Sequence, residues 1–436
     1  MADKTVSVRP LQFQGAIYSH ANFFTSGLAQ NTWYRVPFSN MTRVLPIPTP
    51  DPVESTGSVV MSTWSGAAFD STNDRLIVWG GGHADYAGNE VYIFDLNSLT
   101  WTRFNDPTYT VSANVGDEAI GYYRDVNGNI DYQQPRARHT YNSLEYYPSQ
   151  NKFLAFGATG IWQSGQVTNG VVNALDLSTK TWTQSASTLD SGVGMTVSYD
   201  SLSGTYWFHS NGGYLQEFNP ATNTWTSHGS VFTDPGFNGN RTSVVHPKKR
   251  YLLGIGHIND AAYDGKVLVW NLNTGTSETQ TAKVVQTTGF QDITSANYPG
   301  LAYDPYTENI MSYMGGNLFS LSLETSAWSK IQLSPSNTVT PTNTQVHGTF
   351  GRFRYSTNKN VYVLVNDTTE DVYIYKPTTV IHNTVSVSAI SDTYTIQTPS
   401  VNFDWSATAS LVSGNMTVTS ASVPFNGFFS SCTLRF

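Results

Sequence analysis

The sequence predicts an all-β protein folded as a β-propeller. A segment from residue 76 to residue 104 has the pattern of short strands separated by a glycine-rich loop and a tight turn, and similar segments recur along the chain. The period is roughly 40 to 50 residues, with four short strands in each repeat, which is typical of propeller blades. Helical periodicity of apolar residues is absent throughout, so a helical solenoid is excluded.

The first complete repeat supplies the pattern for the others. An apolar run over 76–79 leads into three glycines at 80–82, and a second apolar run follows at 91–94. A turn over 95–99 then returns the chain to a further strand that begins near Trp101. Because a glycine lacks a Cβ atom, we expect the triple glycine to let a backbone or a large side chain approach closely near the centre of the ring.

Counting this first repeat, the chain carries six copies of the pattern from residue 62 onward. The first strand of each copy ends in an aromatic or histidine residue: Phe69, Tyr146, Tyr199, His246, Tyr303 and Tyr355. The second strand ends in small residues, at 80–82, 157–158, 212–213, 254–256 and 315–316, with a degenerate copy at 364–366. The third strand covers 91–95, 171–176, 215–219, 267–271, 318–323 and 372–375. The fourth strand opens at Trp101, Trp182, Trp225 and Trp328, lacks a tryptophan in the fourth copy and has no counterpart in the sixth.

An isolated strand near the N-terminus fits the place left empty in the sixth copy. Residues 32–37, around Trp33, look like the last strand of a repeat that has no other part. We therefore predict six blades, with this N-terminal strand completing the last sheet, because a closed ring leaves no open sheet edge. The alternative is seven blades, with the seventh assembled from both chain ends.

These features divide the chain into three parts. Residues 1–61 form an N-terminal arm that carries the closing strand, 62–379 form the propeller, and 380–436 form a C-terminal β appendage rich in alternating Ser, Thr and Val. A polar insertion over 105–137 separates the first and second blades. The appendage is too short to be stable alone, so we expect it to pack on the propeller or on another subunit.

The repeat resembles the kelch repeat, in which paired glycines precede a tyrosine and a tryptophan, here Tyr92 and Trp101. More narrowly, GGGHADYAGNEVYIFDL at 80–96, followed by RHTY at 138–141, is similar to a kelch-type group met in bacterial and bacteriophage proteins, many of them described as galactose-oxidase-like. The resemblance implies a kelch-type propeller over about 62–379. It implies little about activity, because propellers carry many functions.

Composition excludes several classes of partner. The net charge is -8, and no run of Lys or Arg provides a basic surface, so we expect no binding to nucleic acid. Cys432 is the single cysteine, which rules out an intrachain disulfide and a cysteine-based zinc site. No stretch approaches the roughly 18 to 20 apolar residues of a membrane span, and the N-terminus has no apolar core of a signal peptide. We expect a soluble protein with no membrane insertion, no cofactor and no classical secretion signal.

Unusual polar residues gather at one end of the predicted blades, which we call the loop face. Here the loop entering strand one and the loop between strands two and three emerge together. Loops between strands two and three carry His83, Asp85, Tyr86, Trp162, His257, Asn259 and Asp260. Segments entering strand one carry Arg138, His139, Tyr141, Arg241 and His347. We expect these side chains to converge around one central funnel as ligand-binding candidates, although Asp85 fits a turn-bonding role equally well.

Two enzyme chemistries would use this funnel in different ways. Copper-radical oxidation, which the galactose-oxidase likeness implies, needs a tyrosine crosslinked to a cysteine, and Cys432 lies outside the blades. Polysaccharide lyase chemistry would use His83, His139 and Tyr141 as base and acid, with Arg138 neutralising the substrate carboxylate. A metal held by His83, His139 and His257 lacks any local ligand spacing, so we predict none.

A binding or structural role is the interpretation we prefer over catalysis. Weak charge, with abundant Tyr, Asn and Thr, suits recognition of a glycan or a surface protein on the loop face. The likeness to phage-borne kelch proteins suggests a virion or extracellular-surface component. In that setting the C-terminal appendage would attach the propeller to other virion or surface subunits.

Overall fold

A computed structural model describes most of the predicted propeller. The described residues are 23–24, 27–47, 59–82, 86–108, 122–124, 130–157, 171–185, 194–209, 214–230, 241–256, 266–273, 282–286, 298–323, 329–342, 347–378, 383–388, 395–398, 405–410, 416–420 and 432–434.

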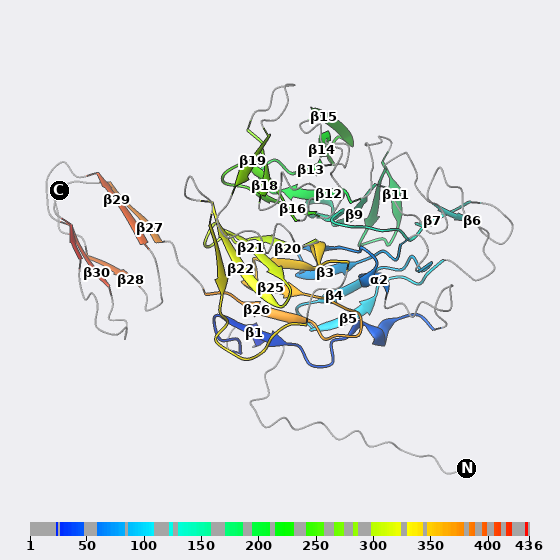
Figure 1. Cartoon of the computed structure of the whole chain (residues 1–436), viewed down its shortest axis with the longest axis horizontal. Coiled ribbons are helices and arrows are strands. Elements are labelled where there is room, and N and C mark those ends of the chain that lie inside the picture. Colours follow the sequence, from blue (N-terminus) through cyan, green and yellow to red (C-terminus); the bar gives the residue numbers. More distant parts are fainter. Residues whose placement is uncertain are drawn as a thin grey trace, which may run out of the picture.

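Six four-stranded antiparallel sheets make up the main body of the described chain (Figure 1). Blade 1 contains β2 (Ala67–Asp70), β3 (Arg75–Val78), β4 (Tyr92–Asp95) and β5 (Thr100–Arg103). Blade 2 contains β8 (Leu144–Tyr147), β9 (Lys152–Phe156), β10 (Val172–Asp176) and β11 (Trp182–Gln184). Blade 3 contains β12 (Thr196–Asp200), β13 (Thr205–His209), β14 (Tyr214–Asn219) and β15 (Thr224–Ser230). Blade 4 contains β16 (Arg241–His246), β17 (Tyr251–Gly256), β18 (Lys266–Asn271) and β19 (Ala282–Gln286). Blade 5 contains β20 (Gly300–Tyr303), β21 (Ile310–Met314), β22 (Asn317–Ser322) and β23 (Ser329–Leu333). Blade 6 contains β24 (Phe353–Ser356), β25 (Val361–Leu364), β26 (Tyr373–Lys376) and β1 (Thr32–Arg35).

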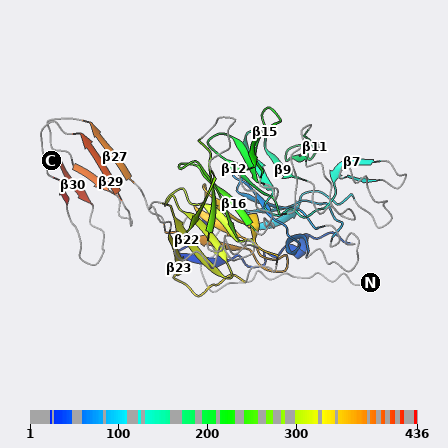
Figure 2. The same ribbon diagram turned by 45° about the horizontal axis from the view of Figure 1, so that its top comes forward.

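The first strands of the sheets lie next to one another and form a ring. Strands β2, β8, β12, β16, β20 and β24 contact one another in that order, and β12 and β16 are side by side in both views (Figures 1 and 2). The ring closes where Arg354 Nη2 donates to the carbonyl of Ala67 at 2.8 Å and Ser356 Oγ donates to Asp74 at 2.7 Å. The prediction of a six-bladed, all-β propeller is confirmed.

Strand β1 completes blade 6, which confirms the prediction that the isolated N-terminal strand closes the last sheet. It pairs antiparallel with β26, with Trp33 opposite Tyr375, and appears as a blue strand beside the orange β26 (Figure 1). The Trp33 side chain is 2% exposed. Its backbone N–H donates to Asn337 Oδ1 at 3.2 Å, and Asn337 Nδ2 donates to its carbonyl at 2.6 Å. Pairing on one side and an amide bridge on the other hold the closing strand in place.

The glycine-rich segment of blade 1 lies in close contact with a buried polar cluster. Gly81 has φ +153°, and a Cβ atom added there would lie 2.8 Å from the carbonyl oxygen of Tyr86. The hydroxyls of Tyr86 and Tyr92 both donate to Glu90 Oε1, and Trp79 Nε1 donates to the carbonyl of Asn89 at 3.1 Å. The close approach expected at the triple glycine is confirmed.

The remaining elements lie outside the six sheets. The insertion between blades 1 and 2 carries the hairpin of β6 (Tyr122–Arg124) and β7 (Ile130–Pro135). The C-terminal part carries β27 (Asn383–Ser388) paired with β29 (Trp405–Ser410), and β28 (Thr395–Thr398), β30 (Met416–Ser420) and β31 (Cys432–Leu434) in a second sheet. Short helical turns with bounds in the described chain include η1 (Met41–Val44), α2 (Val59–Ser62), η2 (Pro148–Gln150) and η4 (Phe350–Arg352). Among the described helices, none has the length and apolarity of a membrane span.

Candidate functional site

One repeated backbone position at the loop face adopts an unusual conformation. Five residues before the aromatic at the end of the first strand, blades 1, 2, 5 and 6 place Trp64, Tyr141, Tyr298 and Phe350, with φ of 49°, 46°, 55° and 48°. Blade 3 has Gly194 there, with φ 71°. A bulky residue in this left-handed region costs about 1–3 kcal/mol, and such residues persist only where the surrounding structure imposes the conformation.

These four aromatic residues form one cluster, which we call the aromatic plug. The rings of Tyr298 and Phe350 lie 4.3 Å apart, and Trp64 Nε1 donates to the hydroxyl of Tyr298 at 3.2 Å. The backbone N–H of Tyr141 donates to the carbonyl of Trp64 at 2.6 Å. Tyr141, Tyr298 and Phe350 are buried, whereas Trp64 is half-buried. The plug therefore fills the space where these four blades converge and leaves one indole partly open to solvent.

Two histidines contact that indole. His347 is half-buried and stacks on Trp64 with ring centroids 3.6 Å apart and an interplanar angle of 26°. Its Nδ1 donates to the carbonyl of Ser62 at 2.7 Å, which fixes the ring. The His139 ring lies 4.9 Å from the Trp64 ring, and its Nδ1 is 3.3 Å from the Tyr141 hydroxyl. Three residues from the predicted funnel, His139, Tyr141 and His347, are thus brought together.

Other predicted site residues have different surroundings. Arg138 is 2% exposed and reaches between blades 1 and 2, with its guanidinium 5.0 Å from the Trp79 ring and Nη2 donating to Asn173 Oδ1 at 2.6 Å. Its guanidinium faces the interblade contact, and its role as a clamp on a substrate carboxylate stays a prediction. Tyr86 is completely buried, and its hydroxyl donates to Glu90.

Arg241 also lies inside the fold. It is 4% exposed, and burial, together with the Arg241 charge, lowers the pKa of His209 well below its usual range. His83, Asp85, Trp162, His257, Asn259 and Asp260 fall outside the described residues. Within the described part of the chain, His, Cys, Asp and Glu side chains form no group of three or more that would hold a metal ion.

The side chains expected to act as acid and base, His139 and Tyr141, have little access to a substrate. The two side chains are 5% and 4% exposed. Burial raises the pKa of Tyr141 above its ordinary value, with a further contribution from Tyr298. Sequence reasoning missed Trp64, Tyr298 and Phe350, although their constant spacing from the aromatic at the strand end was visible in the sequence.

No protein-family model matches the sequence, and no curated protein matches it. Among solved structures, the chain is similar to a crystal structure of the mitotic checkpoint complex, with 12% identity over 85% of this chain and 99% of that chain and a TM-score of 0.41. It is also similar to the β-propeller domain of Cps50 (Swd1) from Myceliophteria thermophila, with 12% identity over 72% of this chain and 96% of that chain and a TM-score of 0.41. The description of the chain as a six-bladed β-propeller rests on its own sheet order.

Proposed function

We propose that this chain is a non-catalytic binding propeller that recognises a glycan on its loop face. The observation that carries the proposal is the half-buried Trp64 indole, stacked on His347 and held in a left-handed backbone conformation by the plug. A fixed aromatic face with polar edges suits the apolar face and peripheral hydroxyls of a sugar ring. Retained backbone strain in a bulky residue is characteristic of ligand-binding positions.

The setting we propose is a virion or an extracellular surface. The weakly charged, tyrosine-rich composition, with 25 tyrosines and 12% charged residues, supports it. In this proposal the C-terminal strands β27–β31 attach the propeller to neighbouring subunits, and the blades belong to the kelch type. The close packing of Gly81 on Tyr86 supports the kelch assignment.

Polysaccharide lyase activity is the second candidate. One observation favours it, the 3.3 Å separation of His139 Nδ1 and the Tyr141 hydroxyl. The burial of both groups and the interblade position of Arg138 count against it. Incubation with acidic polysaccharides, followed by ultraviolet detection of unsaturated sugars, tests this directly. Lyase activity that is lost in the His139→Ala variant would overturn the binding proposal in favour of catalysis.

A glycan array with a matched pair of variants tests the binding proposal. Trp64→Asn removes the indole while keeping a residue that tolerates positive φ. We expect it to weaken glycan binding at least about tenfold, equivalent to 1.4 kcal/mol. Trp225→Ala removes a half-buried tryptophan on β15 and is expected to leave binding unchanged. Equal binding by Trp64→Asn and the wild type would refute the proposal.

A further inference from the structure

A hollow lies on the ring axis at the end of the propeller opposite the loop face. We call this end the turn face. The cavity has a volume of about 330 Å³ and is lined by residues from all six first strands and the turns that follow them. Its rim comes from those turns: Ser71, Pro148, Ser201, Pro247, Pro305 and Thr357. The volume falls in the range of about 300–1,000 Å³ that is usual for small-molecule sites.

A collar of aromatic side chains surrounds this cavity. Its members are the aromatic residues at the last or the last but one position of the first strands, namely Phe69, Tyr146, Tyr199, Tyr303 and Tyr355. In blade 4 the equivalent lining residue is Val245. His246 does not fill the aromatic position, contrary to the sequence interpretation. Its Nδ1 accepts from the N–H of Lys249 at 3.2 Å, as Asp70 Oδ1 accepts from the N–H of Asn73 at 3.0 Å in blade 1.

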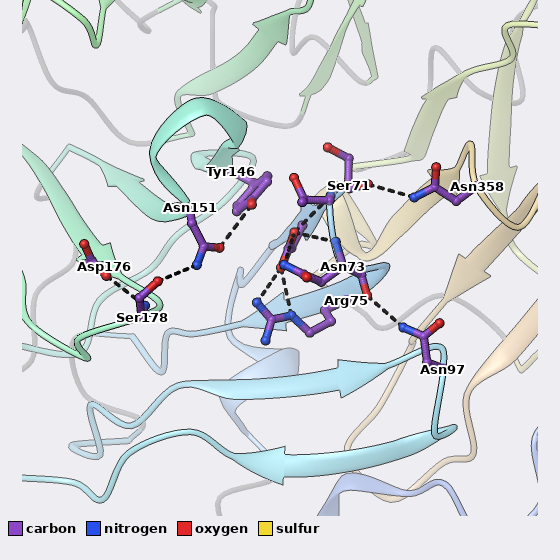
Figure 3. A network of polar contacts seen from close by, with 11 residues as sticks. Ser71, Asn73, Arg75, Asn97, Tyr146, Asn151, Asp176, Ser178 and Asn358 are labelled. Carbon is purple, nitrogen blue, oxygen red and sulfur yellow. Dashed lines mark hydrogen bonds and ion pairs between the residues drawn. The ribbon is translucent and has the colours of Figure 1, made fainter.

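Hydrogen bonds hold the collar and the rim before any ligand arrives. The Tyr146 hydroxyl donates to Asn151 Oδ1 at 3.2 Å, and Asn151 Nδ2 donates to Ser178 Oγ at 2.9 Å (Figure 3). Across the rim, Asn358 Nδ2 donates to the carbonyl of Ser71 at 3.2 Å (Figure 3). Fixed side chains lose little conformational entropy on binding, so the cavity is preorganised.

The charged groups of the cavity neutralise each other. Arg354 Nη1 lies 3.1 Å from Glu145 Oε1, and Arg354 Nη2 donates to the carbonyl of Leu144 at 3.1 Å. The hydroxyls of Ser198 and Ser243 share a hydrogen bond of 2.8 Å. A charged ligand would find no free opposite charge among these groups, whereas a neutral polyhydroxyl ligand would find hydroxyl partners and aromatic faces.

We propose that this cavity is a second ligand site, separate from the loop face, that holds one neutral pyranose ring. The aromatic collar packs on the apolar face of the ring, while the hydroxyls of Ser198 and Ser243 bond its hydroxyls. Single-ring sugars make few contacts, so the free monosaccharide binds at millimolar concentration, near -4 kcal/mol.

Calorimetric titration of the full chain tests this site. The probes are the methyl α- and β-pyranosides of glucose, galactose, mannose and N-acetylglucosamine. At least one should bind, and Ser198→Ala should weaken that binding about fivefold by removing one hydrogen bond of about 1 kcal/mol. Thr357→Trp, at an exposed rim position, should occlude the cavity and abolish binding.

Two controls separate this site from the loop face. Tyr214→Phe removes a hydroxyl from a residue that is 42% exposed on β14 and should leave binding unchanged. Trp64→Asn should also leave it unchanged, even where that variant loses glycan binding on the array. Absence of binding by every pyranoside would overturn the proposal. So would binding that survives Thr357→Trp but is lost in Trp64→Asn.

Discussion

Removal of the Trp33 side chain is expected to open the propeller ring. The indole is 2% exposed, packs edge-on against Tyr313 and Tyr373 with centroids 6.1 and 6.5 Å away, and lies 5.1 Å from Tyr375. Truncation of a buried tryptophan to alanine costs about 3–5 kcal/mol. Each aromatic pair contributes about 0.5–1.5 kcal/mol beyond the buried area. Trp33→Ala should therefore lower the free energy of unfolding by about 4–5 kcal/mol, at the upper end of that range.

Urea denaturation and amide hydrogen exchange would measure this effect. Detachment of β1 leaves one edge of β26 unpaired, so its amides at Tyr373–Lys376 should exchange faster in Trp33→Ala. The matched control is Trp225→Ala on β15, which should cost less and leave β26 protected, because that indole is only half-buried. A loss below about 1 kcal/mol, within the ordinary range of single substitutions, together with unchanged protection of β26, would refute closure by β1.

Three further perturbations follow from the described contacts. Arg354→Met leaves the buried Glu145 carboxylate without its ion pair and should cost about 3–5 kcal/mol in urea denaturation. Gly348→Ala places a Cβ atom 2.1 Å from the Cβ of Tyr298 at φ +90° and should lower the melting temperature, with a loss of about 1–3 kcal/mol from overpacking. Burial raises the pKa of Glu90, so the folded chain binds its proton more tightly than the unfolded chain, and stability should fall as pH rises above the ordinary glutamate range. Glu90→Gln should flatten that fall in melting curves recorded against pH.

Each of these predictions has a control or an outcome that contradicts it. Combining Arg354→Met with Glu145→Gln completes a double-mutant cycle, and additivity within about 0.5 kcal/mol would show that the two residues are not coupled. Gly204→Ala is the control for Gly348, since its φ is +73° but no atom lies within 4 Å of the added Cβ, so it reports backbone strain alone. An unchanged pH slope in Glu90→Gln would show that this carboxyl does not govern the pH dependence.

The blade pattern was predictable because it depends on local chemistry repeated many times. Apolar runs, small residues and tight turns recur at a constant spacing, and the unpaired strand at Trp33 indicated how the ring closes. The aromatic residues that end the first strands were found as a repeat signal. Their role around the cavity was not predicted, because it appears only when six distant segments meet.

The site residues were harder to predict for a physical reason. Arg138 and His139 are neighbours in the sequence, yet one reaches into the interblade contact and the other faces the aromatic plug. Successive side chains on an extended segment point to opposite sides, and only the packed blades decide which side is the interior. The positive φ of Tyr141 is likewise imposed by packing, since a tyrosine disfavours that conformation on its own.

The sequence by itself determined the fold class, the number of blades and the strand that closes the ring, because strand periodicity and turn chemistry act over a few residues. Only the tertiary structure decided which polar residues are buried, how Trp64 meets His347 and where a cavity opens. These features depend on contacts between blades that are far apart in the chain, and such contacts exist only once the ring has closed.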